Sequence, residues 1–240
     1  MKNLCSLQFE TTSDYEQNLQ TLLKLINETA QESIIVAPEV SLTGYDYENF
    51  EALLAFSERA IEEIKKSSYK RVIILSIIEK RDGAVFNFAK VFYDGAVVYE
   101  RAKARLFRFG DEHKYMQEGS DKDFEIVTVA GVKIAVFICF ELRFKELWQM
   151  SEGADVIAVV AWWGESRTEH FRALTQTLAI TNQCYVIASD SQNEECTKMS
   201  GIITPMGEAQ RNETNPRLDV AYSKKEITLM RRYMDVGIDG

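Results

Sequence analysis

The chain has 240 residues, 46% hydrophobic and 27% charged, which is typical of one sizeable globular domain. Its formal net charge of −9 argues against a nucleic-acid partner, because nucleic-acid phosphates require a basic surface. The N-terminal stretch MKNLCSLQFE lacks the apolar segment of a signal peptide, and no stretch approaches the length of a membrane span, so we expect a single cytoplasmic domain, residues 1–240, without a membrane or nucleic-acid partner.

The first half of the chain alternates short apolar stretches with segments of helical periodicity. The predicted elements are a strand at Leu4–Phe9, a helix at Asp14–Ala30 capped by Ser13 or Asp14, a strand at Ser33–Ala37, a helix at Asn49–Lys66 and a strand at Arg71–Ile78. Two further strands, Ala84–Tyr93 and Ala96–Glu100, flank Asp94-Gly95, a strong β-hairpin signal. The polar and aromatic segment 101–123 has no clear period, and a loop this long in a compact domain is usually functional.

The second half continues the alternation of strands and helices. The predicted elements are the strand pair Phe124–Val129 and Val132–Ile138, a helix at Arg143–Met150, a strand at Asp155–Ala161, a helix at Thr168–Thr181, strands at Gln183–Ser189, Met199–Thr204 and Arg217–Tyr222, and a helix at Lys224–Tyr233. Because hairpins interrupt this series, an α/β protein with a mixed sheet, or with two sheets between helix layers, fits better than a simple doubly wound sheet.

Three chemically active side chains stand at the ends of predicted strands. Glu39 follows IIVAP, Lys103 follows VVYE, and Cys139 ends the apolar run KIAVFI. In α/β proteins, ligands gather at the carboxyl ends of the strands. A thiolate there can attack a carbonyl, a carboxylate can carry the proton, and an ammonium can stabilise the oxyanion. Taken singly, each residue also fits a structural role, and a lone cysteine in an apolar run is most often part of the core.

The histidines and cysteines form no metal-binding pattern. The chain has four cysteines and two histidines, with no CxxC and no zinc-site spacing. A Cys–His pair would require His113 or His170 to lie beside Cys139. In a reducing compartment the four cysteines are expected to be thiols.

Six stretches in collinear order resemble the successive signatures of the nitrilase superfamily of carbon–nitrogen hydrolases. They are Pro38-Glu39 with Gly44-Tyr45, Lys103 before Leu106-Phe107, EHKYMQEG from Glu112 to Gly119, GVKIAVFICFELRF, ADVIAVVAWW with the later HFRALTQTLAITNQCYVIASDSQ, and SGIITPMGEA. The resemblance runs from about Leu4 to the end of the chain. Phe-Glu follows Cys139 where many relatives have Tyr-Asp, and Glu141 keeps the charge.

The resemblance implies a role for each matching residue. It implies Glu39 as the general base and then acid, Lys103 as the group that holds the tetrahedral intermediate, and Cys139 as the nucleophile that forms a thioester. Glu112 matches the second glutamate of the family, and the backbone N–H of Phe140 would complete the oxyanion hole. The family fold is a four-layer α-β-β-α sandwich with mixed sheets. The family uses no cofactor or metal, and its members commonly pair, so a homodimer or larger homo-oligomer is implied.

Candidate substrate-binding residues lie after the strand at Asp155–Ala161. Trp162 and Trp163 stand where relatives have a smaller segment, so two indoles are expected to narrow the pocket. Arg167 falls where an ω-amidase-like subgroup has an arginine, and a guanidinium there suits a substrate carboxylate. The alternative is a helix-surface arginine paired with Glu165 or Glu169.

Two further side chains near the predicted site have less specific expectations. Tyr45 is expected either to line the pocket or to pack the Glu39 loop. Arg143, four residues after Cys139, is expected to pair with a nearby acid rather than with substrate.

The sequence therefore predicts hydrolysis of the non-peptide carbon–nitrogen bond of a small amide through a thioester on Cys139. The substrate is expected to be an ω-amide or an N-carbamoyl amino acid. The alternative is a catalytically silent binding or regulatory module on the same fold, with its pocket blocked by the tryptophans. The intact set of Glu39, Lys103, Glu112 and Cys139 favours the enzyme.

Overall fold

The computed structural model describes residues 1–238. The strands, in chain order, are β1 (Asn3–Leu7), β2 (Ser33–Val36), β3 (Val72–Arg81), β4 (Ala84–Tyr93), β5 (Ala96–Ala102), β6 (Val127–Val129), β7 (Val132–Ile138), β8 (Val156–Val160), β9 (Tyr185–Ser189), β10 (Gly201–Ile203), β11 (Ala209–Arg211) and β12 (Arg217–Ala221). The α-helices are α1 (Tyr15–Asn27), α2 (Phe50–Ser67), α3 (Glu112–Tyr115), α4 (Lys145–Met150), α5 (Thr168–Asn182) and α6 (Lys224–Tyr233).

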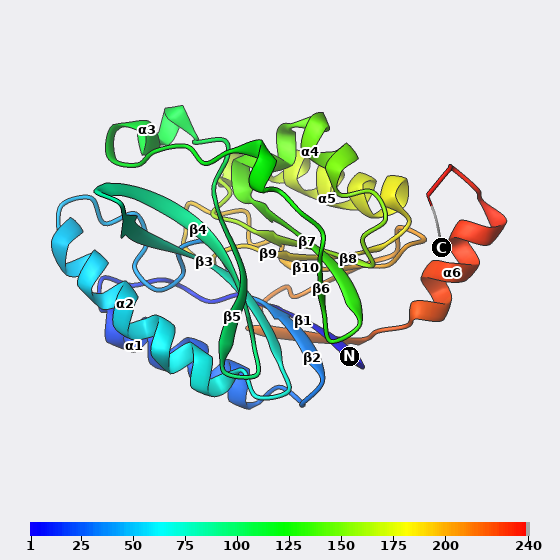
Figure 1. The fold of residues 1–240 in the computed structure, drawn as a ribbon, viewed down its shortest axis with the longest axis horizontal. Coiled ribbons are helices and arrows are strands. Elements are labelled where there is room, and N and C mark those ends of the chain that lie inside the picture. Colours follow the sequence, from blue (N-terminus) through cyan, green and yellow to red (C-terminus); the bar gives the residue numbers. More distant parts are fainter. Residues whose placement is uncertain (239–240) are drawn as a thin grey trace.

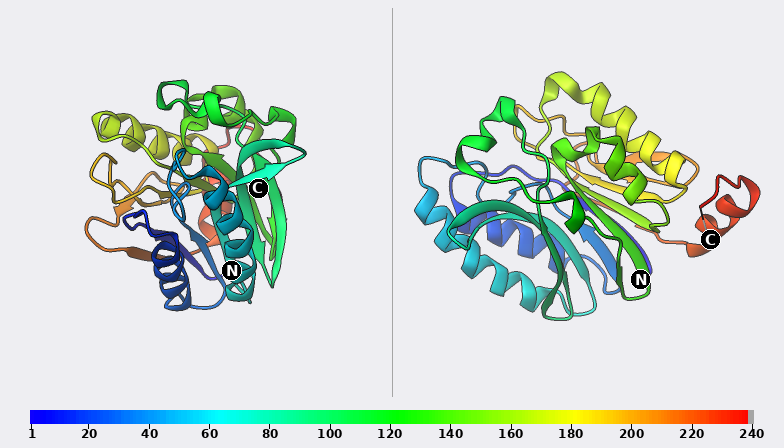
Figure 2. Two further views of the ribbon diagram at one scale, coloured as in Figure 1. Left: turned by 90° about the vertical axis from the view of Figure 1, so that its left-hand side faces the viewer. Right: turned by 45° about the horizontal axis from the view of Figure 1, so that its top comes forward.

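The strands form two six-stranded mixed sheets, with the orders β12-β1-β2-β3-β4-β5 and β11-β10-β9-β8-β7-β6. Each sheet has a parallel centre, β1-β2-β3 in the first and β7-β8-β9 in the second, flanked by antiparallel strands. Helices α1 and α2 cover the outer face of the first sheet, and α4 and α5 cover that of the second, while α6 lies beyond the layers (Figures 1 and 2). The predicted α-β-β-α sandwich is confirmed.

The central strands are apolar along their whole length because both of their faces are buried. In β2, Ile34 and Val36 belong to the core between the sheets, whereas Ile35 belongs to the core under α1 and α2. Successive side chains of β3 alternate in the same way. Ile74 therefore belongs to the core between the sheets, and Ile73 to the core under α1 and α2. None of the helices within residues 1–238 combines the length and the apolar character needed to cross a membrane.

Two-residue turns close the hairpins that the sequence predicts. Asp94-Gly95 and Ala130-Gly131 both have positive φ at each residue (46° and 82°, 49° and 78°), as a type I′ turn requires. A third such turn, Asp82-Gly83 (52° and 82°), joins β3 to β4. Strand β3 therefore runs to Arg81 and is longer than predicted.

The chain departs from prediction just after Cys139. In place of one helix at 143–150, a 3-10 helix spans Cys139–Arg143 and α4 follows from Lys145. Phe144 between them is extended (φ −103°, ψ 110°), which interrupts the helical hydrogen bonding despite the apolar period. The short edge strand β11 was not predicted, since three residues give too little pattern to detect.

Candidate active site

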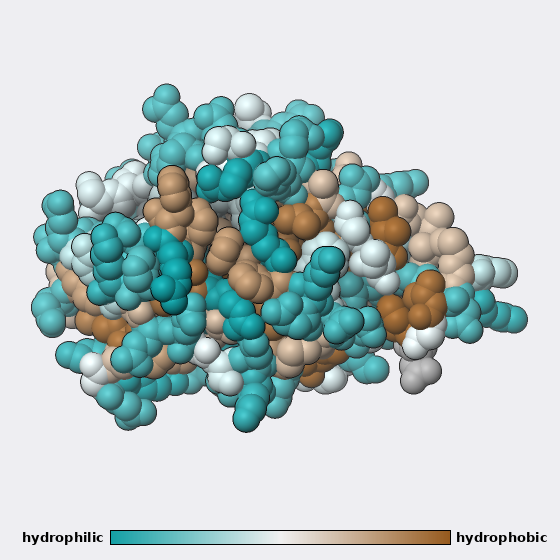
Figure 3. Space-filling view, turned by 90° about the horizontal axis from the view of Figure 1, so that it is seen from above, coloured by the Kyte–Doolittle hydropathy of each residue, from teal (hydrophilic) through white to brown (hydrophobic). Residues whose placement is uncertain are grey.

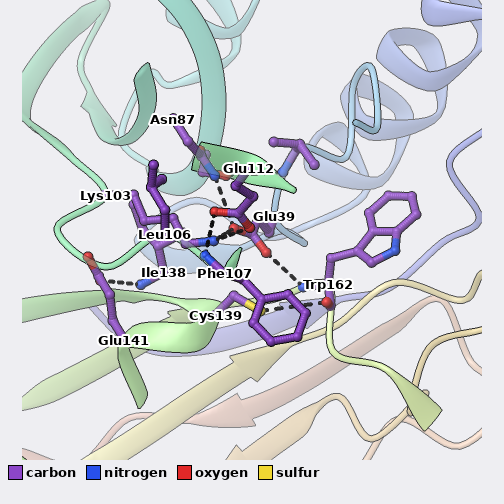
Figure 4. A network of polar contacts seen from close by, with 12 residues as sticks. Glu39, Asn87, Lys103, Leu106, Phe107, Glu112, Ile138, Cys139, Glu141 and Trp162 are labelled. Atoms are coloured by element: carbon purple, nitrogen blue, oxygen red, sulfur yellow. Dashed lines mark hydrogen bonds and ion pairs between the residues drawn. The ribbon is translucent and has the colours of Figure 1, made fainter. Parts of the chain in front are cut away.

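The ends of four strands from both sheets meet at one place. Glu39 follows β2 and Lys103 follows β5 in the first sheet, while Cys139 follows β7 and Trp162 follows β8 in the second. Figure 4 shows the carboxylates of Glu39 and Glu112 turned toward the ammonium of Lys103, with the Cys139 sulfur nearby. The structure thus brings together the four candidate catalytic residues of the sequence.

The Lys103 ammonium lies between two carboxylates. Its Nζ is 2.8 Å from Glu39 Oε1 and 2.8 Å from Glu112 Oε1, and all three side chains are buried. The Tyr45 hydroxyl donates to Glu112 Oε1 (3.0 Å), and the Phe107 backbone N–H donates to Glu112 Oε2 (3.1 Å). Glu112 is the first residue of α3, within the long segment 101–123, and these contacts hold its carboxylate against Lys103.

Glu39 is oriented by two further donors. Asn87 Nδ2 donates to Oε1 (3.0 Å), and the backbone N–H of Trp162 donates to Oε2 (3.1 Å). The carbonyl of Asn87 also accepts from the backbone N–H of Lys103 (2.7 Å). Sequence reasoning missed Asn87, although a polar residue between two phenylalanines in a buried strand was a visible signal.

Cys139 adopts a conformation that few residues other than glycine accept. Its φ is +43°, in the left-handed region, and a non-glycine residue held there costs about 1–3 kcal/mol. The sharp turn from β7 into the 3-10 helix presents Sγ to the site, where it contacts the carbonyl oxygen of Trp162 at 3.5 Å. Strain of this kind is characteristic of a nucleophile at a strand-to-helix turn.

Burial determines the protonation of these groups. It raises the pKa of the Glu39 carboxyl above its ordinary value, although the Lys103 charge opposes the rise. Burial also raises the pKa of the Cys139 thiol well above 9.0, and the Glu39 charge adds to this rise. Burial alone lowers the pKa of Lys103, but the carboxylates of Glu39 and Glu112 outweigh it and raise that pKa. The resting site therefore holds a protonated thiol and a charged lysine.

A second buried charge pair joins the two sheets beside the site. Arg101 binds both carboxylate oxygens of Glu141, and both side chains are fully buried. The same carboxylate accepts from the backbone N–H of Ala104 (2.7 Å) and of Ile138 (2.7 Å). These donors stand next to Lys103 and Cys139, so Glu141 fixes the distance between the two chain segments. The sequence indicated its charge but not this role.

A small pocket opens above the Cys139 sulfur. It has an empty volume of about 230 Å³ and is lined by Phe107, Cys139, Phe140, Arg143, Trp162, Trp163 and Arg167. Both tryptophans border it. Seen from the side of α3 to α5, hydrophobic patches lie among hydrophilic residues on the protein surface (Figure 3).

Two arginines, Arg143 and Arg167, border the pocket. The Arg143 guanidinium lies over the Trp163 ring (4.8 Å to the centroid), and that of Arg167 lies over Phe107 (5.4 Å). Within residues 1–238, neither makes an ion pair with an acid, so the predicted acidic partner of Arg143 is wrong. Burial lowers the pKa of Arg143, and the charge of Arg167 lowers it further.

The alternative for Arg167, pairing on the helix surface, is not observed. Glu169 pairs with Arg172 (2.5 Å), and Arg167 Nη1 contacts only the neighbouring Ser166 hydroxyl (3.4 Å) among the hydrogen bonds of the described residues. His170 Nδ1 lies 3.1 Å from Arg143 Nη2. In the described part of the chain, no group of three or more His, Cys, Asp or Glu side chains is placed to hold a metal ion.

Comparison with known proteins agrees with this fold. Residues 3–216 match the carbon–nitrogen hydrolase family, and the chain belongs to that family. It is 31% identical over 192 residues to the 2-oxoglutaramate amidase of Bacillus subtilis (strain 168), covering 75% of this chain and 73% of that protein. It is 28% identical over 206 residues to the omega-amidase YafV of Yersinia enterocolitica, covering 82% and 78%.

Solved structures show the same fold. The carbon–nitrogen hydrolase from Helicobacter pylori G27 superposes with a TM-score of 0.84 at 17% identity, covering 96% of this chain and 92% of that one. A mutant of the Nesterenkonia AN1 amidase superposes with a TM-score of 0.79 at 16% identity, covering 97% of each chain. Family membership and the similar amidases identify the chain as an amidase that acts on non-peptide carbon–nitrogen bonds.

The buried pair between Arg101 and Glu141 makes a stability prediction. Replacing Glu141→Gln leaves the Arg101 charge buried without its counter-ion, so we expect the free energy of unfolding to fall by roughly 3–5 kcal/mol. Urea denaturation followed by circular dichroism measures this change. The control is Glu169→Gln, which removes an exposed ion pair and should cost about 1 kcal/mol or less. Equal losses of unfolding free energy in the two variants would show that the buried pair stabilises the fold no more than an exposed pair does.

Proposed function

We propose that the chain hydrolyses a small ω-amide that carries a carboxylate, using Cys139 as nucleophile, Glu39 as base and acid, and Lys103 as oxyanion ligand. The observation that carries this proposal is the Lys103 ammonium held between Glu39 and Glu112 near a cysteine that lines a pocket. A thiol whose pKa is raised by burial needs a base to become a nucleophile.

In the first half-reaction, Glu39 takes the thiol proton and the thiolate sulfur bonds to the amide carbonyl carbon. The carbonyl oxygen becomes an oxyanion, which the Lys103 ammonium and the backbone N–H of Phe140 stabilise. Glu39 then gives the proton to the leaving nitrogen, the carbon–nitrogen bond breaks, and ammonia departs from a thioester on Cys139.

In the second half-reaction, water replaces ammonia. Glu39 takes a proton from the water, the hydroxide oxygen attacks the thioester carbonyl, and the carbon–sulfur bond breaks. The proton on Glu39 returns to the sulfur, and the free acid leaves. Throughout, Glu112 and Tyr45 hold Lys103 in place, and Glu112 supplies the second negative charge that keeps the lysine protonated.

The arginines of the pocket support the choice of a carboxylate-bearing substrate. Arg143 and Arg167 place two positive charges on its wall with aromatic rings beneath them. Guanidinium groups that have no acid of their own suit a ligand carboxylate. Two similar proteins are a 2-oxoglutaramate amidase and an omega-amidase, which favours an ω-amide over an N-carbamoyl amino acid. That the chain forms a single domain of residues 1–240, assembles as a homo-oligomer and works in the cytoplasm stays a prediction.

The catalytic roles predict the loss of activity in two single variants. Cys139→Ala removes the nucleophile and Glu39→Gln removes the base, so each should lower ammonia release from ω-amides by a factor on the order of 10³ or more. Ammonia is measured over a panel of ω-amides, N-carbamoyl amino acids and simple amides. Cys184→Ala, at a buried thiol away from the strand ends of the site, serves as the control. Full turnover by either catalytic variant would exclude the mechanism.

The two pocket arginines predict a selective change in substrate affinity. Arg167→Met or Arg143→Met should raise the KM for a carboxylate-bearing amide by roughly 10- to 100-fold, the worth of a charged hydrogen bond. The KM for a neutral amide of similar size should change little. Arg172→Met, on the exposed face of α5, is the matched control. A parallel rise for the neutral amide would show that these arginines shape the pocket rather than bind the carboxylate.

The raised pKa of Glu39 predicts how the rate depends on pH. The base must be ionised to accept the thiol proton, so kcat/KM should fall as the pH drops through the pKa of Glu39. Because burial raises that pKa above 4.5, the fall should begin above pH 4.5, while circular dichroism still shows a folded protein. A rate that stays constant down to pH 4.5 is incompatible with Glu39 as the base.

A further inference from the structure

Another carboxylate, that of Asp190, lies one residue beyond β9 and is fully buried. Its Oδ1 accepts from the backbone N–H of Trp163 (2.8 Å). Its Oδ2 accepts from the backbone N–H (3.1 Å) and the hydroxyl (2.6 Å) of Thr197. Burial raises the pKa of Asp190 to about 7, while these donors favour its ionised form.

The peptide group between Trp162 and Trp163 connects Asp190 to Cys139. The N–H of this peptide donates to Asp190, and its carbonyl oxygen, that of Trp162, is the group that the Cys139 sulfur contacts at 3.5 Å. The preceding N–H, that of Trp162, donates to Glu39 Oε2. A single stretch of backbone therefore touches the proposed nucleophile, the proposed base and Asp190.

The planarity of the peptide bond turns this arrangement into a constraint. Fixing the direction of the N–H also fixes the direction of the carbonyl on the opposite side of the same plane. A carboxylate at the N–H also polarises the peptide and strengthens its carbonyl as an acceptor. An ionised carboxylate has acceptors for three donors and no donor of its own, whereas an asparagine would point an NH₂ group at one of them.

We propose that Asp190 is a positioning residue, which orients the Cys139 thiol through the peptide between Trp162 and Trp163. This inference rests on the proposed function of Cys139 as the nucleophile. The surrounding backbone has other anchors, because Thr197 N–H also donates to the Trp163 carbonyl (2.8 Å) and Glu165 N–H donates to the Glu195 carbonyl (2.7 Å). Loss of Asp190 should therefore free this peptide without detaching the whole segment.

The test compares Asp190→Asn with Thr197→Val. Both variants remove hydrogen bonds from the same buried cluster. Thr197→Val removes the bonds of the hydroxyl to Asp190 and to the Met199 N–H, whereas only Asp190→Asn changes the side chain that accepts from the 162–163 peptide. Asp190→Asn should lower kcat for an ω-amide by roughly 10- to 100-fold, the effect of a small misplacement of a reacting group, with little change in KM. It should also slow alkylation of Cys139 by iodoacetamide, followed by peptide-mapping mass spectrometry.

Thr197→Val should keep both rates near those of the unaltered protein while losing a similar amount in Tm. The proposal is overturned if Asp190→Asn keeps both rates, or if the two variants lose them equally. Alkylation requires no substrate. Slower alkylation in Asp190→Asn, together with an unaltered protein that is silent on every amide, would therefore reject the proposed function and support the positioning role.

A measurement on the unaltered protein tests the coupling between the 162–163 peptide and the thiol even if Asp190→Asn does not fold. Labelling with ¹⁵N-tryptophan gives backbone amide signals from the three tryptophans of the chain. Alkylating Cys139 removes the hydrogen that the Trp162 carbonyl accepts, so the Trp163 amide signal should shift and that of Trp148 should not. A Trp163 signal that does not respond to alkylation would show that the peptide does not couple Asp190 to the thiol.

Discussion

The buried carboxylate of Glu141 joins the two sheets at the point where the active site is built. It binds Arg101 and the backbone of Ala104 on the side of the first sheet, and the backbone of Ile138 on the side of the second. Lys103 and Cys139 are the neighbours of these two backbone donors. Because a sandwich of two separate sheets could otherwise slide, this carboxylate sets the distance between a lysine and a thiol that belong to different layers.

The site itself is a balance of buried charges. One ammonium lies between two carboxylates, and the thiol stays neutral because burial and the Glu39 charge both raise its pKa. Such an arrangement is stable only while every partner is present, since an unpaired buried charge is costly. The arrangement also suits amide hydrolysis. Glu39 can accept a proton, while the neighbouring lysine stays charged and can stabilise the oxyanion.

Much of the fold could be predicted from the sequence because its signals are local. Strands buried on both faces read as continuous apolar runs, and Asp94-Gly95 marked a hairpin that the structure confirms. Glu39, Lys103 and Cys139 could also be seen to follow predicted strands. Because the carboxyl ends of parallel strands share one edge of a sheet, these side chains could be expected to lie near one another. The helix predicted from Arg143 was wrong at its start, because an extended Phe144 overrides the apolar period.

The supporting residues of the site could not be predicted in the same way. Asn87, Glu141 and Asp190 act through contacts with groups that are distant in sequence. No spacing rule shows such contacts, because the sequence of a strand or loop does not tell whether a polar side chain in it is hydrogen-bonded to the protein or solvated. Arg143 was assigned an acidic partner for the same reason, whereas the structure places it over Trp163 at the pocket wall.

The central claim is that the carbon–nitrogen bond is broken through a covalent intermediate on Cys139. Mixing the enzyme with an ω-amide, quenching with acid during turnover and measuring the mass of the peptide that contains Cys139 tests this claim directly. We predict a mass increase equal to the acyl group of the substrate, lost on treatment with hydroxylamine and located on Cys139. Turnover with no acyl adduct on that peptide, or with the adduct on another cysteine, would contradict it.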